Sequence, residues 1–166
     1  LEVTEVTRGA NAVLVGGGAE LDLELCYIFL AADGVICQDG AGLTMDRCYV
    51  RSTTDNAVLV TGAGSVATSI CNSLFAFNDG AAIRAENEGE ATVSYATIMR
   101  NGVGVITSGA PAPTLNIDSS LIYLNEGLGV DQAAGTINDS LNYVLGNSGN
   151  PGPPEEWHYP QPTNYS

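Results

Sequence analysis

Three similar phrases recur along the chain: "NSLFAFNDGAAI" at 72–83, "YATIMRNGVGVI" at 95–106 and "SSLIYLNEGLGV" at 119–130. Each contains a turn residue followed by an apolar stretch. Aligning the chain on these turn residues, with spacings of 22, 24, 22 and 25 residues, gives five units that begin after Gly34, Asn56, Gly80, Gly102 and Gly127. A repeat of this length is typical of a solenoid built from one supersecondary unit with loops of variable length.

Within each unit the apolar residues alternate, which predicts a strand with one buried face. The positions one and three residues after the turn residue are all apolar: Val35, Ala57, Ala81, Val103 and Leu128, then Cys37, Leu59, Ile83, Val105 and Val130. Two further short strands follow in each unit, for example "LTMDR" at 43–47 and "CYVRS" at 48–52. Three short strands in every unit predict one coil of a parallel β-helix.

The repeated phrases resemble those of right-handed parallel β-helices, which occur in pectate lyases, phage tailspikes and many secreted or surface-attached bacterial proteins. The resemblance covers residues 12–147 and implies an all-β solenoid of six or seven coils, each with three short strands. We expect a partial coil or cap at 1–11 and a tail rich in proline and aromatic residues at 148–166. Because this scaffold carries many functions, the resemblance bears on the fold and not on the activity.

Three asparagines, Asn78, Asn101 and Asn125, occupy corresponding turns in successive units. Asparagine tolerates turn conformations, and stacked asparagine side chains can hydrogen-bond to one another. The sequence therefore predicts a structural asparagine ladder, and a ligand site is the less favoured interpretation.

Cys26, Cys48 and Cys71 recur at intervals of 22 and 23 residues, which predicts that they stack on one wall, while Cys37 lies on a different strand. Three arrangements remain open. Buried thiols are favoured because buried cysteine behaves as a small hydrophobic residue. One disulfide, Cys26–Cys48 or Cys48–Cys71, and a zinc site are the alternatives.

The charge of the chain restricts its partners. Five arginines, no lysine and 19 acids give a net charge of -14, so we expect no binding to nucleic acid or anionic membranes. No apolar run approaches the roughly 20 residues of a membrane helix, so we expect no membrane insertion. The sequence begins at Leu1, which we interpret as a processed chain or an excised domain from an extracellular or cell-surface protein.

No residues are singled out as catalytic, and no cofactor is expected. Arg84 lies beside Glu86, Glu88 and Glu90, which are calcium-ligand candidates; an acidic, solvated turn is the favoured interpretation of the same residues. The predicted outward face of the first strand set is small and aliphatic, which suits contact with another protein surface. Its predicted interface residues are Ile36, Val58, Val60 and Ile106.

The tail adds Trp157, His158, Tyr159 and Tyr165 in a proline-rich context, which predicts a docking segment. Together these features predict a non-enzymatic structural protein of a surface fibre or filament, associating head-to-tail with copies of itself. Two alternatives stay open: a lyase-like enzyme that acts on acidic polysaccharide, or a fragment of one, and a carbohydrate-binding module with a cell-surface polysaccharide as its partner.

Overall fold

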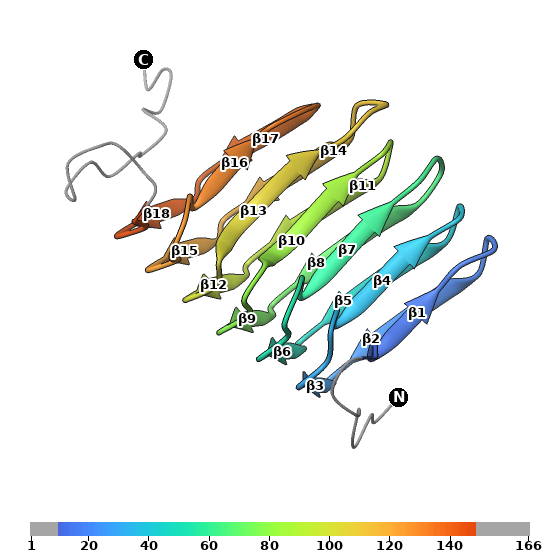
Figure 1. Ribbon diagram of the computed structural model, residues 1–166, viewed down its shortest axis with the longest axis horizontal. Coiled ribbons are helices and arrows are strands. Elements are labelled where there is room, and N and C mark those ends of the chain that lie inside the picture. Colours follow the sequence, from blue (N-terminus) through green and yellow to red (C-terminus); the bar gives the residue numbers. More distant parts are fainter. Residues whose placement is uncertain (1–9, 149–166) are drawn as a thin grey trace, which may run out of the picture.

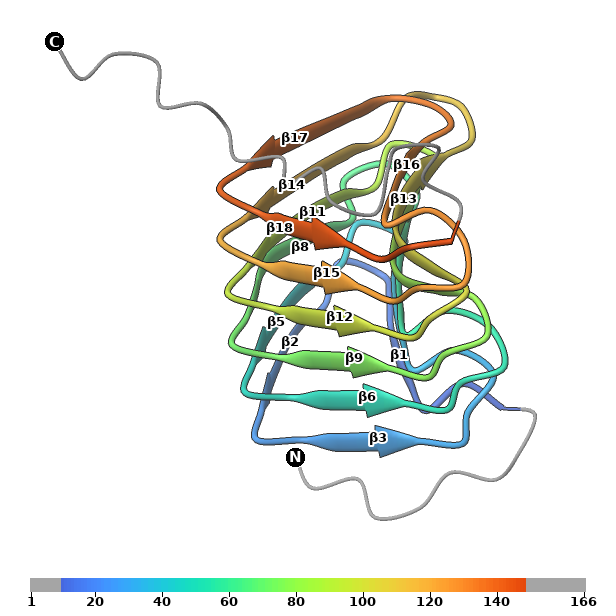
Figure 2. The ribbon, with the colours of Figure 1, turned by 90° about the vertical axis from the view of Figure 1, so that its left-hand side faces the viewer.

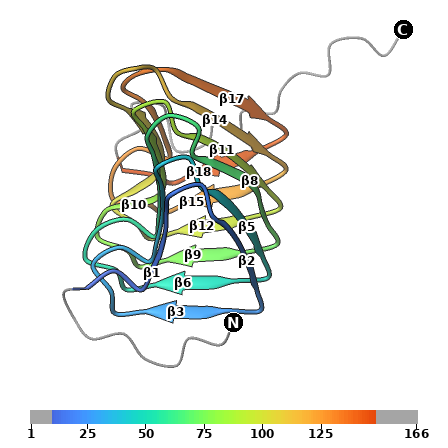
Figure 3. The same ribbon diagram turned by 90° about the vertical axis from the view of Figure 1, so that its right-hand side faces the viewer.

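The chain folds into a solenoid of six coils, each with three strands (Figures 1, 2 and 3). The structure is a computed structural model that describes residues 10–148. All strand pairs are parallel, and corresponding strands of successive coils stack into three six-stranded sheets. The predicted all-β, three-stranded coil is confirmed, with six coils. Among the described residues no helix is long and apolar enough to span a membrane.

The three sheets each take one strand from every coil. Sheet A holds β1 (Val13–Val15), β4 (Val35–Gln38), β7 (Val58–Thr61), β10 (Ala81–Glu86), β13 (Val103–Ser108) and β16 (Val130–Gln132). Sheet B holds β2 (Glu20–Glu24), β5 (Gly42–Asp46), β8 (Val66–Cys71), β11 (Glu90–Ser94), β14 (Thr114–Asp118) and β17 (Thr136–Ser140). Sheet C holds β3 (Tyr27–Phe29), β6 (Tyr49–Arg51), β9 (Leu74–Ala76), β12 (Thr97–Met99), β15 (Leu121–Tyr123) and β18 (Tyr143–Leu145).

Every strand of sheet C is bounded on both sides by one residue with positive φ. Leu25 (φ 55) and Leu30 (φ 59) flank β3, and Tyr95 (φ 52) and Arg100 (φ 52) flank β12. A single left-handed residue turns the chain sharply. These corner residues are Leu25, Leu30, Arg47, Ser52, Asn72, Phe77, Tyr95, Arg100, Ser119, Leu124, Leu141 and Gly146.

The core lies between the three sheets and consists of aliphatic columns that run along the solenoid axis. In sheet C the inward column contains Ile28, Val50, Phe75, Ile98 and Ile122, each at most 1% exposed. The predicted inward residues Ile83 and Val105 pair with each other in sheet A and are fully buried. Burial of such columns, at about 25 cal/mol per Å² of apolar surface, is the main source of stability.

The expected register of β7 is wrong by one residue. Val58 and Val60, which we expected on the outward face, are fully buried, while Leu59 points outward. Val58 pairs with Val35 on one side and Ile83 on the other. Asp55, and not Asn56, lies opposite Gly80 of the next coil, so counting from Asn56 began one residue too late and selected the wrong side of the strand.

The predicted asparagine ladder is present and is longer than expected. The side-chain amide nitrogen of Asn78 donates to Oδ1 of Asn101 (2.8 Å), Asn101 to Asn125 (3.0 Å), and Asn125 to Asn147 (2.8 Å). Thr53 extends the ladder at the other end through a hydrogen bond from Oγ1 to Oδ1 of Asn78 (2.9 Å). All five residues are buried. The ladder thus satisfies buried polar groups of five successive turns through direct side-chain hydrogen bonds.

The cysteine column is correct for Cys26 and Cys48 and wrong for Cys71. Cys71 pairs with Asp46 at the end of sheet B, and Ser73 takes the place below Cys48, donating from Oγ to the carbonyl oxygen of Cys71 and accepting from the Cys48 amide. A register shift between β5 and β8 adds a residue to β8, which moves Cys71 out of the column. None of the four cysteines, all of which lie in the described part, forms a disulfide.

Candidate functional site

Most exposed apolar side chains gather on one side of the molecule, the outward surface of sheet C, whose strands are stacked from β3 to β18 in Figure 2. We call this surface, together with the corner residues that flank its strands, the C face. Among the described residues eight large apolar side chains are exposed. Seven of them belong to the C face: Leu25, Tyr27, Leu30, Phe77, Tyr95, Leu124 and Leu141. An apolar surface that continues over all six coils is a candidate docking site.

Local backbone geometry explains why these side chains are outside. The strands of sheet C are only three residues long, so the central residue points inward and its two neighbours point outward. The left-handed corner residues on either side also point outward, as the 68% exposure of Leu25 and the 64% exposure of Tyr95 show. Each coil therefore presents four outward positions, which alternate with two buried residues such as Cys26 and Ile28 in the first coil.

The first two strands of the C face carry a cluster of aromatic rings and one cation. The Tyr27 ring lies 4.9 Å from Phe29 and 5.1 Å from Tyr49, between ring centroids. The Arg51 guanidinium carbon is 5.5 Å from the Tyr27 centroid and 5.9 Å from the Tyr49 centroid. These distances are those of cation–π contacts, which hold the guanidinium over the rings. We call these four residues the aromatic–arginine cluster.

A second cation lies on the same face. The Arg100 guanidinium carbon is 5.6 Å from the Phe77 ring centroid. Neither Arg51 nor Arg100 forms an ion pair with any described residue, whereas Arg47 pairs with Glu24 and Asp46, and Arg84 with Glu86. The Arg51 Nε atom is buried and has no hydrogen-bond partner in residues 10–148.

No carboxylate lies on the C face, although the chain has 19 acids and a net charge of -14. The outward residues of sheet B, by contrast, include Glu20, Asp22, Glu24, Asp46 and Asp118. The C face is therefore the side of the solenoid on which an acidic and apolar partner meets the least repulsion.

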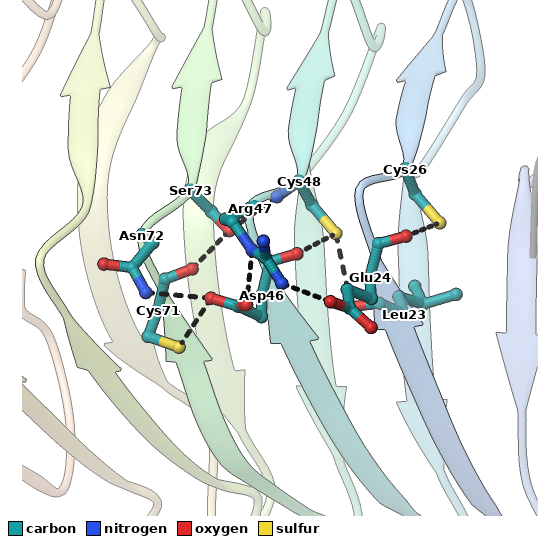
Figure 4. Close-up of polar contacts among 9 residues, drawn as sticks. All are labelled: Leu23, Glu24, Cys26, Asp46, Arg47, Cys48, Cys71, Asn72 and Ser73. Atoms are coloured by element: carbon teal, nitrogen blue, oxygen red, sulfur yellow. Dashed lines mark hydrogen bonds and ion pairs between the residues drawn. The ribbon is translucent and has the colours of Figure 1, made fainter.

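A polar network marks the edge between sheets B and C (Figure 4). Asp46 accepts hydrogen bonds from the Asn72 side-chain amide (2.8 Å), from Arg47 Nε (2.7 Å) and from the Cys71 thiol (3.3 Å). These bonds lower the pKa of Asp46 to about 2, and the bond from Asn72 has the largest effect. Arg47 also pairs with Glu24 of the preceding coil. The network is satisfied within itself, so we interpret it as structural.

The thiols are poorly placed for nucleophilic chemistry. Burial raises the pKa of the Cys37, Cys48 and Cys71 thiols, and Cys71 additionally lies beside the Asp46 carboxylate. Their polar contacts are mostly with backbone oxygens: the Cys48 thiol donates to the carbonyl oxygens of Leu23 and Asp46, both at 3.4 Å. The favoured interpretation, buried thiols, agrees with this geometry for Cys26, Cys37 and Cys48.

The calcium-ligand candidates do not converge. Glu86 is the last residue of β10 and forms an ion pair with Arg84, with 2.9 Å between Glu86 Oε2 and Arg84 Nε. Glu88 lies in the following turn, and Glu90 is the first residue of β11 in another sheet. Within residues 10–148 no group of three or more His, Cys, Asp or Glu side chains is arranged to hold a metal ion. The acidic, solvated turn is the interpretation that fits this arrangement.

The other predicted interface residues have mixed outcomes. Ile36 and Ile106 alternate with inward residues in sheet A and so lie on its outward side, where Ile36 is only 7% exposed. The tail residues Trp157, His158, Tyr159 and Tyr165 lie outside the described residues. The sequence did not predict the C face, because its side chains come from three-residue strands and from left-handed corners that no typical turn residue marks.

Sheet B carries a shallow polar groove of about 570 Å³ near the last coils. Its outward side chains bond mainly with one another: Asn138 donates to Asn116 (2.7 Å), and Ser140 donates to Asp118 (2.6 Å). Asp139 occupies the position in the last coil that Ile117 fills in the preceding one. The groove therefore lies where the apolar core gives way to polar residues.

A family model described as the right handed beta helix region matches residues 1–119 and residues 33–149. These matches span most of the chain, and the chain belongs to this family. Comparison with curated proteins and comparison with solved structures each found no match.

Proposed function

We propose that this chain is a non-enzymatic structural module of an extracellular surface or fibre, which associates head-to-tail with copies of itself through its coil ends, its C-terminal tail and the C face. The observation that carries the proposal is the C face. It is apolar over six coils, it has two arginines without ion pairs in the described part, and it lacks carboxylates.

The coil ends supply the direction of association. β1, β2 and β3 lie at one edge of the three sheets, and β16, β17 and β18 lie at the other. Edge strands present backbone groups that can pair with a further strand. The two edges differ, so contact between them is heterologous and repeats without closing, which generates a filament.

Sedimentation velocity of the full chain over a range of concentrations tests this proposal. We expect species heavier than the 17.1 kDa monomer to accumulate as concentration rises at physiological salt. Replacing Tyr27 and Tyr49 by Ser should weaken association, because these rings form the most clustered part of the C face. The matched control is Leu59→Ser, which removes an apolar side chain from the outward side of sheet A on β7, a strand paired on both sides and away from either edge, and it should have no effect. A chain that stays monomeric at every concentration would rule out the proposal.

One observation favours a second function, a carbohydrate-binding module for acidic polysaccharide. Tyr27, Tyr49 and Tyr143 occupy the same outward position of sheet C, and Arg51 lies beside the first two. Aromatic rings stack on sugar rings, and arginine pairs with carboxylates. Isothermal titration with polygalacturonate separates the two functions: binding that is lost in Tyr49→Ser, with no self-association, would favour the module.

The enzymatic alternative is tested with the same polymer, polygalacturonate. A lyase would release unsaturated products from polygalacturonate and would lose that activity in Arg84→Ala. We expect no product from the unmodified chain, because Arg84 is already paired with Glu86 and the neighbouring glutamates diverge.

A further inference from the structure

The C face carries cations that have no carboxylate partner in the described part of the chain. Two of its three arginines, Arg51 and Arg100, are held over aromatic rings and make no ion pair within residues 10–148, whereas Arg47 is paired. The chain has 19 acids and five arginines, yet no carboxylate of the described residues neutralises these two cations. The face therefore has the chemistry of a receptor for a segment that brings both carboxylates and apolar surface.

Residues 149–166 have both properties. They lie outside the described part, and their sequence places Glu155 and Glu156 directly before Trp157, with Tyr159 two residues later. Glutamate complements Arg51 and Arg100 in charge, and the aromatic residues match the aromatic–arginine cluster in kind. The prolines on either side of this stretch, at 151, 153, 154, 160 and 162, limit the entropy that is lost on docking.

We propose that the C face binds residues 149–166 of a second copy of this chain, with Glu155 and Glu156 at Arg51 and Arg100 and with Trp157 against the aromatic–arginine cluster. This inference rests on the proposed function, since it names the site at which one copy holds the next. The segment is long enough, because 18 residues can span about 60 Å when extended, whereas six strands cover about 24 Å.

The position of the cluster favours a second copy over the same chain. The aromatic–arginine cluster belongs to β3 and β6, at the first edge of sheet C, while the described chain ends at Ser148, just after β18 at the opposite edge (Figure 2). In a head-to-tail stack, the β18 edge of one copy meets the β3 edge of the next. Residues 149–166 then start about one strand spacing from the neighbour's cluster, against about five spacings from their own.

A face-to-face pairing of two C faces fits less well. It would bring together two surfaces that carry cations and no carboxylate, and like charges in a contact oppose association. Segment 149–166 removes this repulsion because it supplies the opposite charge.

The test uses the full chain and its single tryptophan, Trp157. Tryptophan emission shifts to shorter wavelength when the ring leaves water, so docking is read directly alongside sedimentation velocity. The reversed-charge chain carries Arg51→Glu and Arg100→Glu, and the restored chain carries these together with Glu155→Arg and Glu156→Arg. A third chain, Arg84→Glu, changes charge on sheet A and serves as the control, and circular dichroism verifies the fold of each.

We expect a blue shift of Trp157 emission that grows with concentration in parallel with the sedimenting mass. The reversed-charge chain should associate about tenfold more weakly, the restored chain should recover to within about threefold, and Arg84→Glu should match the unmodified chain. A synthetic peptide of residues 149–166, added to the full chain, should compete with association, whereas a scrambled peptide should not.

Three results would overturn the inference. A blue shift that is independent of concentration would place the segment on its own chain. Association that persists in the reversed-charge chain, with Trp157 in water, would leave self-association standing and remove this site from it. Monomers at every concentration would overturn the proposed function, and a fluorescently labelled peptide that fails to bind the C face would then reject the site as well.

Discussion

At the scale of single residues, the buried asparagines show how this fold satisfies polar groups in its interior. Each ladder oxygen accepts two hydrogen bonds from the preceding coil: Asn101 Oδ1 accepts from the side-chain amide of Asn78 (2.8 Å) and from its backbone amide (3.2 Å). The Asn101 side-chain amide in turn donates to the carbonyl oxygen of Phe75 (3.1 Å). One residue therefore serves several buried groups in two neighbouring coils.

Replacing Asn101 by Ala should lower the free energy of unfolding by about 3 kcal/mol, because it leaves buried donors of Asn78 and a carbonyl of Phe75 without partners. Urea denaturation measures the change. The matched control is Asn138→Ala, which removes an exposed asparagine bonded to Asn116 and should cost less than about 0.5 kcal/mol. Equal losses in the two variants would show that the ladder is not a special source of stability.

Asp46 gives the fold a stabilising charge whose effect depends on pH. Its pKa is lowered to about 2, first by the Asn72 amide and then by Arg47 and Cys71, so it is below the ordinary value of 3.8. The stabilisation is therefore fully present above about pH 4 and is lost as the pH falls through about 2. Asp55 behaves in the opposite way, because burial and the neighbouring Asp33 raise its pKa.

We expect Asp46→Asn to melt at a lower temperature than the unmodified chain at pH 7. The difference between the two melting temperatures should shrink below pH 4 and be largely lost by pH 2, where about half of the Asp46 carboxylate is neutral. Thermal melts at four or five pH values measure it. A difference that is constant from pH 7 to pH 2 would mean that the carboxylate charge does not contribute.

At the scale of strands, repetition in the sequence was sufficient to predict the three-stranded parallel coil, the asparagine ladder and the burial of Ile83 and Val105. It was insufficient for register where the turn residue was ambiguous. Asp55 lies opposite Gly80, so counting from Asn56 shifted the expected pattern of β7 by one residue, and such a shift reverses the two faces of a strand. The bulge that adds a residue to β8 displaced Cys71 in the same way.

The candidate site depended even more on register. The C face is built from short strands and single-residue corners, and left-handed leucine, tyrosine or phenylalanine is not a recognisable turn signal in a sequence. Only the three-dimensional stacking brings Tyr27, Phe29, Tyr49 and Arg51 together.

The register of β7 can be tested by a pair of adjacent substitutions. Val60→Asp should lower the free energy of unfolding by about 3 to 5 kcal/mol, because it buries a carboxylate in the core without a partner. Leu59→Asp should cost about 1 kcal/mol or less, since Leu59 points outward and pairs in register with Arg84. Chemical denaturation measures the free energy of unfolding of both variants. A larger loss in Leu59→Asp than in Val60→Asp would support the register expected from the sequence.

At the scale of the whole molecule, the three faces of the solenoid differ in chemistry. Sheet B is lined by acids, hydroxyls and amides, sheet A carries scattered aliphatic residues and the Arg84–Glu86 pair, and the C face is apolar and free of carboxylates. With a net charge of -14, neighbouring rods should repel one another sideways at low salt, and salt should screen this repulsion. Growth along the axis is then favoured over bundling.

The central claim is that copies of this chain stack along the solenoid axis. Electron microscopy of the full chain at high concentration and physiological salt tests it most directly. Six coils at about 4.8 Å each predict unbranched filaments with a subunit repeat of about 29 Å, and with the strands perpendicular to the filament axis. Fields of isolated particles the size of one solenoid, at every concentration tried, would contradict the claim.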